Sequence, residues 1–288
     1  MNKSYLFINN PISGGGKHDF VEIFESFKEK FPTHKIINTT HIGHAKELAS
    51  QYQHKYDIIV AVGGDGTINE IASVIINSNT ELGIIPNGSA NGLAFHLDLP
   101  MKVEKAILHL LDSTAKPIDV IEVNNRIFVN MAGVGFDGHI NVLFNQTKLR
   151  GLWSYAKLIF TEYIRYKPFN YKIDIANATY KGSAFFIVFA NTTQYGHNFH
   201  IAPNAEVNDG IMHITLVTKP PFIFIPFLLR TVFKGKALDS KHCTELACKE
   251  MKLMFNNEAM HLDGEIPTGN GTKELKFKVL KNALKVIY

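Results

Sequence analysis

The sequence predicts an α/β domain built on an open, mostly parallel sheet, followed by a largely antiparallel β domain. Up to Ser113, strand-like apolar runs alternate with helix-like patterns, and this alternation is typical of a parallel sheet. Three loops that contain glycine directly follow such runs, as ligand-binding loops do at the carboxyl edge of open sheets. After Pro117 the apolar runs become short and many alternate with period two, which indicates antiparallel strands.

The first half divides into units, each with a strand-like run and then a helix-like pattern. The runs are short, apolar and bounded, and the helical stretches show apolar residues three and four apart. The units, each given as strand and then helix, are Tyr5–Asn9 and Phe20–Phe31, Lys35–Thr40 and Ala45–Tyr52, Ile58–Val62 and Ile68–Ile75, and Leu82–Ile85 and Ala106–Ser113. We expect Thr67 to cap the third helix.

The stretch from Ile58 to Glu70 is the centre of the predicted first domain. Its strand runs into Gly63-Gly64-Asp65-Gly66-Thr67, and a helix-like pattern follows. A strand, a glycine turn and a helix start form an anion site, because free N–H groups and the helix dipole favour negative charge. Asp65 would repel a phosphate there, so it suits a Mg²⁺ ligand or an acceptor of a hydroxyl proton. A purely structural turn is the alternative.

Two further polar glycine loops follow the first and fourth strands. They are Asn10-Pro11-Ile12-Ser13-Gly14-Gly15-Gly16-Lys17 and Pro86-Asn87-Gly88-Ser89-Ala90-Asn91. Lys17 and the open backbone amides of the first loop could meet phosphates, whereas a flexible strand-to-helix connection is the alternative. Neither a Walker loop nor the G-x-G-x-x-G dinucleotide motif occurs in the central turn, where Asn69 takes the third glycine position.

The second half predicts a hairpin, further strands and two helices. Ile118–Val123 and Arg126–Met131 flank Asn124-Asn125, which is typical of a tight hairpin. The other expected strands are Tyr171–Ala176, Ala184–Ala190, Met212–Val217, Lys252–Phe255, Glu274–Val279 and Leu284–Ile287, and the expected helices are Leu152–Tyr166 and Phe222–Phe233. We therefore expect domains at 1–120 and 121–288, with the last residues free to return to the first domain.

Composition excludes several classes of protein. The chain has 288 residues, of which 45% are hydrophobic and 19% charged, so it is a packed globular protein rather than a disordered one. A net charge of +4 suits anionic substrates or an anionic membrane surface but is too weak to indicate nucleic acid. Two cysteines, Cys243 and Cys248, and an opening without a signal-peptide layout indicate a cytoplasmic protein.

Four stretches occur in a fixed order along the chain. They are Asn10-Pro11-x-Ser13-Gly14-Gly15-Gly16-Lys17, Gly63–Glu70, Pro86-x-Gly88-Ser89-x-Asn91 and Asp263-Gly264-Glu265. This ordered set resembles the diacylglycerol kinase catalytic family, which includes bacterial soluble lipid kinases, sphingosine kinases and ceramide kinase. Asn130–Asp137 and Ala202–Gly210 look like second-domain signatures of that family, so the resemblance runs almost end to end. The central motif alone is shared with NAD kinases and phosphofructokinases.

The resemblance implies a fold, an activity and a nucleotide site. The fold would be a Rossmann-like, NAD-kinase-like α/β domain and a C-terminal antiparallel β-sandwich, with the active site in the cleft between them. The activity would be transfer of the γ-phosphate of ATP to a hydroxyl of a lipid such as diacylglycerol. The residues implied to contact ATP are Asn10, Ser13, Gly14, Gly15, Gly16, Lys17, Thr39, Gly63, Gly64, Asp65, Gly66, Thr67, Ile68, Asn69 and Ser89.

The same resemblance implies Glu265 as the proton acceptor, with Asp263 beside it to orient it or to hold metal. Asp65 is the next candidate for the base. Elementary chemistry agrees, because phosphoryl transfer needs positioning, neutralisation of charge by Mg²⁺ and a group that accepts the hydroxyl proton.

A second cation site is implied in the Ala202–Gly210 stretch. By resemblance to bacterial members, Asp209 would hold a structural Mg²⁺ or Ca²⁺ together with the backbone carbonyls of Glu206 and Ile211. An Asx turn before a strand is the alternative.

The segment Phe222–Arg230 is apolar, aromatic and too short to span a bilayer, which takes about 20 residues. Basic residues flank it, namely Lys219, Arg230, Lys234 and Lys236. It suits shallow docking on a membrane, and a buried helix of the β domain is the alternative.

The sequence therefore predicts a cytoplasmic lipid kinase that acts peripherally at the inner membrane surface. Its expected partners are ATP, Mg²⁺ and a lipid substrate, without nucleic acid, and a homodimer stays open. Two alternatives remain: a NAD-kinase-like enzyme with a soluble substrate, and a nucleotide-binding regulatory protein without turnover.

Overall fold

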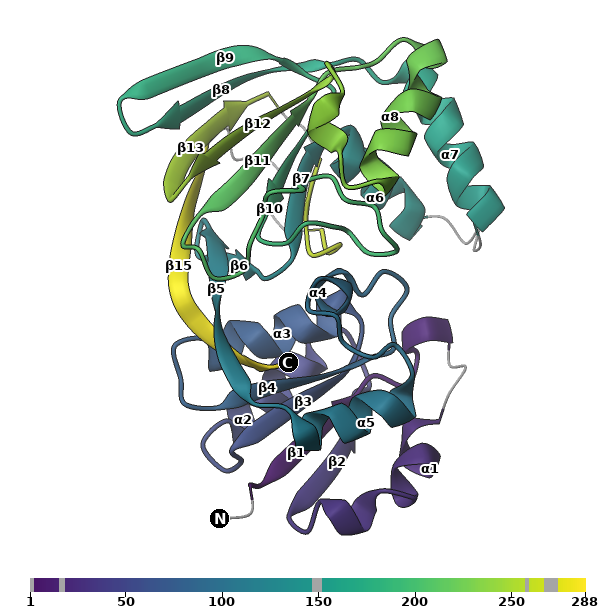
Figure 1. The fold of residues 1–288 in the computed structure, drawn as a ribbon, viewed down its shortest axis with the longest axis vertical. Helices are drawn as coiled ribbons and strands as arrows, with labels where there is room; N and C mark the ends of the chain where they lie inside the picture. The colour runs from purple at the N-terminus through teal and green to yellow at the C-terminus, as the bar shows by residue number, and fades with distance from the viewer. Residues whose placement is uncertain (1–2, 16–18, 147–151, 257–258, 267–273) are drawn as a thin grey trace.

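The computed structural model describes residues 3–15, 19–146, 152–256, 259–266 and 274–288, and it divides into two lobes (Figure 1). The lower lobe in Figure 1 contains the N-terminal α/β elements, and the upper lobe contains most of the remaining strands. Two strands, β5 (Ala115–Val123) and β15 (Glu274–Ile287), run from one lobe into the other. Among the described helices, none combines the length and apolar character needed to cross a bilayer.

A parallel sheet in the order β2-β1-β3-β4 forms the centre of the lower lobe. All neighbours in this sheet are parallel, with β1 between β2 and β3. Strands β1 and β3 are buried along their whole length, which explains their continuous apolar sequences. The bounds are β1 Tyr5–Asn9, β2 His34–Asn38, β3 Ile58–Gly63 and β4 Glu81–Pro86.

Helices cover both faces of this parallel sheet. Alternate residues of β1 belong to different cores, because Leu6 packs with α2 and α3 whereas Phe7 packs with α1 and α5. Four aromatic rings, Phe7, Phe20, Phe24 and Phe31, fill the second core. The bounds are η1 Ser13–Gly15, α1 Phe20–Glu25, η2 Lys28–Lys30, α2 His44–Tyr52, α3 Asp65–Ile75, α4 Gly92–His96 and α5 Val103–Asp112.

The upper lobe is an antiparallel β-sandwich. One sheet has the order β12-β11-β10-β7-β14, and the facing sheet contains β15, β13, β8 and β9 together with β5 and β6. The two sheets share a core in which Phe189 of β10 stacks on Phe277 of β15, with ring centroids 4.2 Å apart. The strands are β6 Arg126–Phe128, β7 Met131–Gly135, β8 Phe169–Ile175, β9 Ala178–Ala184, β10 Phe186–Ala190, β11 Met212–Val217, β12 Cys243–Cys248, β13 Glu250–Phe255 and β14 Met260–Leu262.

Helical segments flank the sandwich on one side (Figure 1). Helix α6 follows β7 directly, and its residues Phe136 and Ile140 pack with Phe185 in a small core against which α7 lies. The bounds are α6 Phe136–Gln146, α7 Leu152–Arg165, η3 Phe222–Phe224, α8 Ile225–Phe233 and η4 Ala237–Asp239.

Strand β15 makes the two lobes share one sheet. It pairs with β13 and β5 in the upper lobe, and at Val286 it pairs in parallel with Leu82 of β4 in the lower lobe. The pairing register with β5 shifts between Leu280 and Leu284, and buried Asp119 accepts a hydrogen bond from the Asn282 amide at 2.7 Å there. The sequence predicts separate strands at Glu274–Val279 and Leu284–Ile287. This prediction is wrong, because one continuous strand spans the shift in register.

Most of the other segments predicted as helix or strand are helix or strand in the structure. The hairpin of β5 and β6 is confirmed, and Asn124 and Asn125 at its turn have positive φ angles of 46° and 65°. The prediction that Thr67 caps α3 is wrong, because α3 begins at Asp65 and its N-cap is Gly64. Helices α4 and α6 and strands β7, β9 and β12 were missed. Strand β9 is almost wholly exposed and so carries no apolar pattern.

Candidate active site

Three glycine loops meet at the carboxyl edge of the parallel sheet. A Cβ on Gly64, after β3, would lie 3.0 Å from the Cα of Gly88, after β4. A Cβ on Gly14, after β1, would lie 2.8 Å from the Asn87 carbonyl oxygen, and Gly14 has a φ of +61°. Only glycine allows backbones to approach this closely, so the loops seen in the sequence form one cradle.

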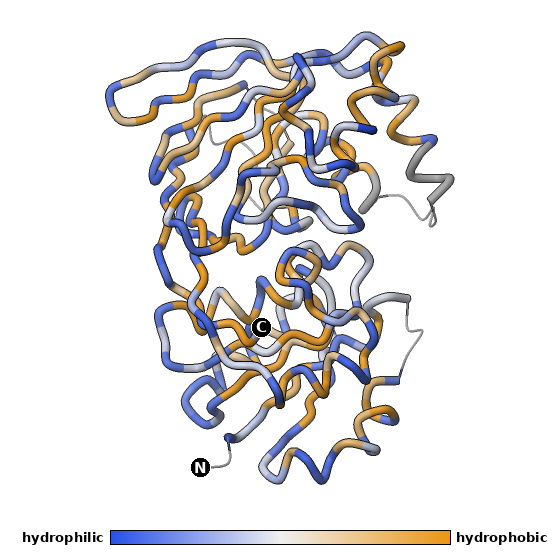
Figure 2. Tube along the Cα trace, viewed as in Figure 1, coloured by the Kyte–Doolittle hydropathy of each residue, from blue (hydrophilic) through white to orange (hydrophobic). Residues whose placement is uncertain are grey.

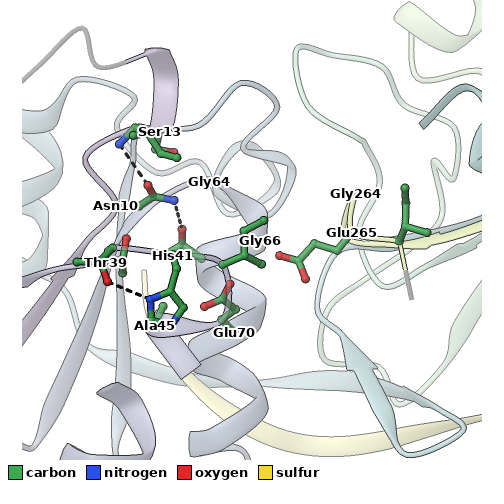
Figure 3. A pocket seen from close by; sticks show the side chains of 15 residues that line it. Asn10, Ser13, Thr39, His41, Ala45, Gly64, Gly66, Glu70, Gly264 and Glu265 are labelled. Carbon is green, nitrogen blue, oxygen red and sulfur yellow. Dashed lines mark hydrogen bonds between the residues drawn. The ribbon is translucent and has the colours of Figure 1, made fainter. Parts of the chain in front are cut away.

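A pocket of about 690 Å³ opens beside this cradle and receives residues from both lobes (Figure 3). Its volume lies in the usual range for small-molecule sites, about 300–1,000 Å³. The lining residues are Asn10, Ile12, Ser13, Thr39, Thr40, His41, Ile42, Ala45, Gly64, Gly66, Thr67, Glu70, Gly264, Glu265 and Ile266. The last three come from the turn after β14 in the upper lobe, so the pocket lies between the lobes.

Six of the residues predicted to contact nucleotide line this pocket, namely Asn10, Ser13, Thr39, Gly64, Gly66 and Thr67. The predicted residues that do not line it are Gly14, Gly15, Gly63, Asp65, Ile68, Asn69 and Ser89, whereas Gly16 and Lys17 lie outside the described residues. Ile68 is a fully buried core residue, and Ser89 is exposed on the loop after β4. These assignments stay predictions.

Asn10 connects the first loop to the start of α3. Its Oδ1 accepts a hydrogen bond from the Ile12 amide at 3.3 Å, and its Nδ2 donates to Thr67 Oγ1 at 3.3 Å. Beside it, Thr40, His41 and Ile42 line the pocket, although sequence reasoning did not assign them to the nucleotide site. They lie just after β2, at the carboxyl end of a strand, where open parallel sheets bind ligands. That position was the signal by which the sequence could have found them.

Glu265 reaches from the upper lobe toward the first turn of α3 (Figure 3). A Cβ on Gly66 would lie only 2.7 Å from Glu265 Oε1, so the carboxylate sits over the helix start. Helix starts present unpaired amide N–H groups and positive potential, which suit a carboxylate or a phosphate. Desolvation, together with the charges of Glu70 and Asp263, nevertheless raises the pKa of Glu265 to about 7.

Glu70 lines the same pocket from the second turn of α3. Its Oε1 accepts a hydrogen bond from the Gly43 amide at 2.9 Å, and its Oε2 accepts one from the Lys46 amide at 3.2 Å. Gly43 is the N-cap of α2, so Glu70 caps that helix and ties it to α3.

Asp263 is buried and fully engaged by hydrogen-bond donors. Its Oδ1 accepts from the amides of Asn130 and Met131 at 2.9 and 3.0 Å. Its Oδ2 accepts from the Val129 amide at 2.9 Å and from Asn69 Nδ2 at 2.7 Å. Burial still raises its pKa above the ordinary value. The arrangement makes Asp263 a clamp that holds the turn bearing Glu265 against α3, and Asn69 takes part in that clamp.

Asp65 begins α3 but faces the start of α4. Its carboxylate oxygens lie 3.2 Å from the Gly92 amide and 3.4 Å from the Leu93 amide. Burial, with the charge of Asp263, raises the pKa of Asp65 to about 6. Its contacts join the second and third glycine loops.

A buried polar network under the Glu265 turn was not found from the sequence. His261 Nε2 lies 2.8 Å from Asp137 Oδ2, and Tyr195 donates its hydroxyl hydrogen to the same oxygen. The Gly264 amide donates to His261 Nδ1 at 3.3 Å, which supports the turn from below. Asp137 is the acid in the Asn130–Asp137 signature of the sequence, and this acid was the available signal for a buried network.

The predicted structural cation site shows a local turn. Asp209 Oδ1 accepts a hydrogen bond from the Ile211 amide at 2.8 Å, which is the Asx turn given as the alternative. Asp209 Oδ2 lies 3.6 Å from His213 Nε2, and Glu206 is exposed. Within the described ranges, no group of three His, Cys, Asp or Glu side chains could hold a metal ion. The site therefore stays a prediction.

The parallel sheet, its three glycine loops and a carboxylate from the β-sandwich lobe are the parts that a phosphotransferase of the kinase class needs. Comparison with known families agrees. Residues 4–123 match the diacylglycerol kinase catalytic domain, and residues 130–288 match the YegS C-terminal NAD kinase beta sandwich-like domain. The chain belongs to this diacylglycerol kinase and YegS-type lipid kinase family.

Individual relatives span nearly the whole chain. A Yersinia enterocolitica protein named "Probable lipid kinase YegS-like" is 28% identical over 99% of this chain and 96% of its own length. A Bacillus subtilis protein named "Diacylglycerol kinase" is 25% identical over 91% of this chain and 90% of its own length. A crystal structure from Bacillus anthracis, described as a putative diacylglycerol kinase, is similar in fold, with a TM-score of 0.81 at 22% identity, and covers 99% of this chain and 95% of its own.

Proposed function

We propose that this protein is an ATP-dependent lipid kinase that transfers the γ-phosphate of ATP to a hydroxyl group of a lipid such as diacylglycerol. Membership of the family supports the reaction class, and the name of the Bacillus subtilis relative supports the lipid acceptor. The observation that carries the proposal is the Glu265 carboxylate over Gly66, where the glycine loops of the lower lobe meet.

Glu265 would accept the proton of the lipid hydroxyl. A base works best when its pKa is near the operating pH, and the pKa of Glu265 is raised to about 7. Asp263 would position this carboxylate through its four hydrogen bonds rather than touch the substrate. The amides at the start of α3 would stabilise negative charge on the transferred phosphoryl group.

The glycine loops would hold the phosphates of ATP through their backbone N–H groups, because glycine leaves these groups uncovered by side chains. Mg²⁺ at kinase sites is usually held by substrate phosphates and one or two carboxylates, so a dedicated protein cage is not needed. We propose that Glu70, the α3 carboxylate that lines the pocket, would take part, and the bound ion would neutralise charge on the phosphates. The enzyme would work in the cytoplasm, at the inner membrane surface.

The proposal is tested by incubating the protein with γ-labelled ATP, Mg²⁺ and micelles that contain diacylglycerol, phosphatidylglycerol or a sphingoid base. We expect label in an organic-solvent extract, and we expect Glu265→Gln to lower kcat by about 10²-fold or more while ATP affinity stays unchanged. Label on NAD or another water-soluble acceptor would favour the NAD-kinase-like alternative. ATP binding with no transfer to any acceptor would favour a regulatory protein.

A further inference from the structure

His261 is a buried imidazole directly under the turn that carries Glu265, and it takes no direct part in the proposed transfer. It lies on β14, beside β7 and in the same sheet as β10. Strands β7 and β10 are apolar along their length, and Figure 2 shows mainly hydrophobic tube in this part of the upper lobe. A polar ring in such surroundings needs hydrogen-bond partners, so its partners show what it does.

The turn at Asp263 and Gly264 has two backbone amides that its own hydrogen bonds do not use. Leu262 and Glu265 exchange both backbone hydrogen bonds of a two-residue hairpin at 2.8 Å. Asp263 and Gly264 have positive φ angles of 47° and 84°, as a type I′ turn requires. The Asp263 amide donates to a carbonyl oxygen of β7 at 2.9 Å, and the Gly264 amide donates to His261 Nδ1 at 3.3 Å. His261 therefore supplies the acceptor for the second of these amides.

Asp137 fixes the tautomer and the orientation of the His261 ring. Because Nδ1 accepts a hydrogen bond from Gly264, the proton of the neutral ring lies on Nε2. Nε2 then donates to Asp137 Oδ2 at 2.8 Å, and Tyr195 donates its hydroxyl hydrogen to the same oxygen. The ring is thus held by a carboxylate at one nitrogen and holds the turn amide at the other.

Two glycines make room for this pair of side chains. Gly133 of β7 pairs with His261 of β14, and a Cβ on Gly133 would collide with Asp137 Oδ2 and lie 2.6 Å from His261 Nε2. In the first turn of α6, a Cβ on Gly138 would collide with the Ala259 carbonyl oxygen, just before β14. A side chain at either position would push Asp137 out of hydrogen-bond reach of the ring.

We propose that His261 is a positioning residue for Glu265, because it holds the Gly264 amide and thereby sets where the carboxylate lies over α3. This role rests on the proposed function, in which Glu265 accepts the hydroxyl proton. Asp263 anchors its own end of the turn through its carboxylate. A Cβ on Gly264 would meet only open space among the described residues, and glycine torsions are permissive, so packing does not orient this peptide. Its hydrogen bond to His261 does.

The test replaces the ring with two amide side chains, each of which copies one of its nitrogens. In His261→Asn the side-chain oxygen takes the place of Nδ1 and can accept from Gly264, whereas Asp137 loses a partner. In His261→Gln the side-chain amide can donate to Asp137, but no acceptor stands at the place of Nδ1. We expect His261→Gln to lower kcat about tenfold with KM for ATP and lipid unchanged, since a misplacement of about 1 Å can cost about 10²-fold. His261→Asn should lower kcat by no more than about threefold.

Amide exchange of Gly264, followed by NMR, measures the same hydrogen bond without any lipid. It should become about fivefold faster in His261→Gln, which is the usual worth of one hydrogen bond, and stay near the wild-type rate in His261→Asn. His139→Gln is the matched control, because His139 Nε2 also lies 2.8 Å from a carboxylate, that of Glu162, but contacts α7 rather than the turn. It should leave both kcat and the exchange rate unchanged. Thermal melts and ATP binding would show that each variant is folded.

A double-mutant cycle checks that the ring acts through the carboxylate. In a Glu265→Gln background, His261→Gln should have little further effect on kcat, and a full tenfold loss there would overturn the proposal. If a His261 variant does not fold, Tyr195→Phe removes one donor from Asp137 and leaves the ring in place. It should lower kcat about threefold, and an unchanged kcat would then overturn the proposal.

Wild-type kcat in His261→Gln would also overturn the proposal. Equal losses of kcat in His261→Gln and His261→Asn would do the same and leave the ring with a packing role. If the wild type phosphorylates no lipid, the proposed function fails and the exchange of Gly264 decides the positioning role by itself. Faster exchange in His261→Gln alone would then support the role, and equal exchange in all variants would overturn it.

Discussion

Replacing Gly66 by alanine tests whether the position of Glu265 over α3 matters for turnover. Gly66 is the second residue of α3, and a Cβ there would lie 2.7 Å from Glu265 Oε1. Contacts between carbon and oxygen normally stay beyond about 3.3 Å. The Glu265 carboxylate, at the end of a flexible side chain, must therefore retreat by about 0.6 Å.

The expected effect is on catalysis rather than on folding. A misplacement of about 1 Å can cost about 10²-fold in rate, so a shift of about 0.6 Å should lower kcat about tenfold. The free energy of unfolding should stay unchanged or rise by up to about 1 kcal/mol, because alanine favours helix over glycine. ATP affinity should fall less than kcat, since the amide of residue 66 stays in place.

The assay is steady-state kinetics with a double-mutant cycle. In a Glu265→Gln background, Gly66→Ala should have little further effect on kcat if it acts through the carboxylate. Shortening the acid in the Gly66→Ala, Glu265→Asp variant should recover part of the loss, because aspartate withdraws the carboxylate from the new methyl group. Wild-type kcat in Gly66→Ala would refute the reasoning. Equal losses from Gly66→Ala in both backgrounds would mean that this glycine serves the nucleotide alone.

Four further predictions concern Glu265, Asp263 and Asp209. Because the pKa of Glu265 is raised to about 7, kcat/KM should rise as pH increases through about 7, and Glu265→Gln should remove this dependence. The raised pKa also means that the folded protein loses stability as Glu265 ionises, between about pH 4.5 and pH 7. Because glutamine resembles the protonated acid, Glu265→Gln should raise Tm at pH 8.5 but not at pH 4. Asp263→Asn should lower the free energy of unfolding by about 2 kcal/mol or more in urea titrations, since buried amides lose an acceptor, and should lower turnover. Asp209→Ala should abolish the loss of Tm that chelator causes in the wild type with Mg²⁺ or Ca²⁺.

Each of these has an outcome that contradicts it. A pH profile unchanged in Glu265→Gln would move the titrating base elsewhere, with Asp65, whose pKa is raised to about 6, as the next candidate. Wild-type stability in Asp263→Asn would show that the clamp contributes little, and Val129→Ala, which keeps the amide, serves as its control. Equal chelator responses of the wild type and Asp209→Ala would remove the structural cation from this account.

Much of the architecture follows from local sequence. The apolar runs Tyr5–Asn9 and Ile58–Val62 are buried on both faces of a parallel sheet, as their continuous β-branched and aromatic residues predict. The glycine loops after β1, β3 and β4 meet because parallel strands place their carboxyl ends at one edge. Asn124-Asn125 sets its hairpin because asparagine tolerates the positive φ angles of the turn.

Only the tertiary structure decided which distant groups meet. The sequence separates Glu265 from Gly66 by most of the chain, and their approach depends on how the β-sandwich packs against α3. No local pattern states that Asp263 is already satisfied by four donors, or that Asn69 faces it rather than the pocket.

Sequence by itself determined most elements of this protein and the order of its glycine loops, because backbone propensity and apolar period are local properties. The acids that could act there were given by the resemblance to the diacylglycerol kinase catalytic family. Tertiary structure decided that β15 is one strand shared by both lobes, that Phe160 of α7 joins Phe222 in one exposed face, and where each carboxylate points. Pairing register and side-chain direction depend on long-range packing free energy, which a segment of sequence does not contain.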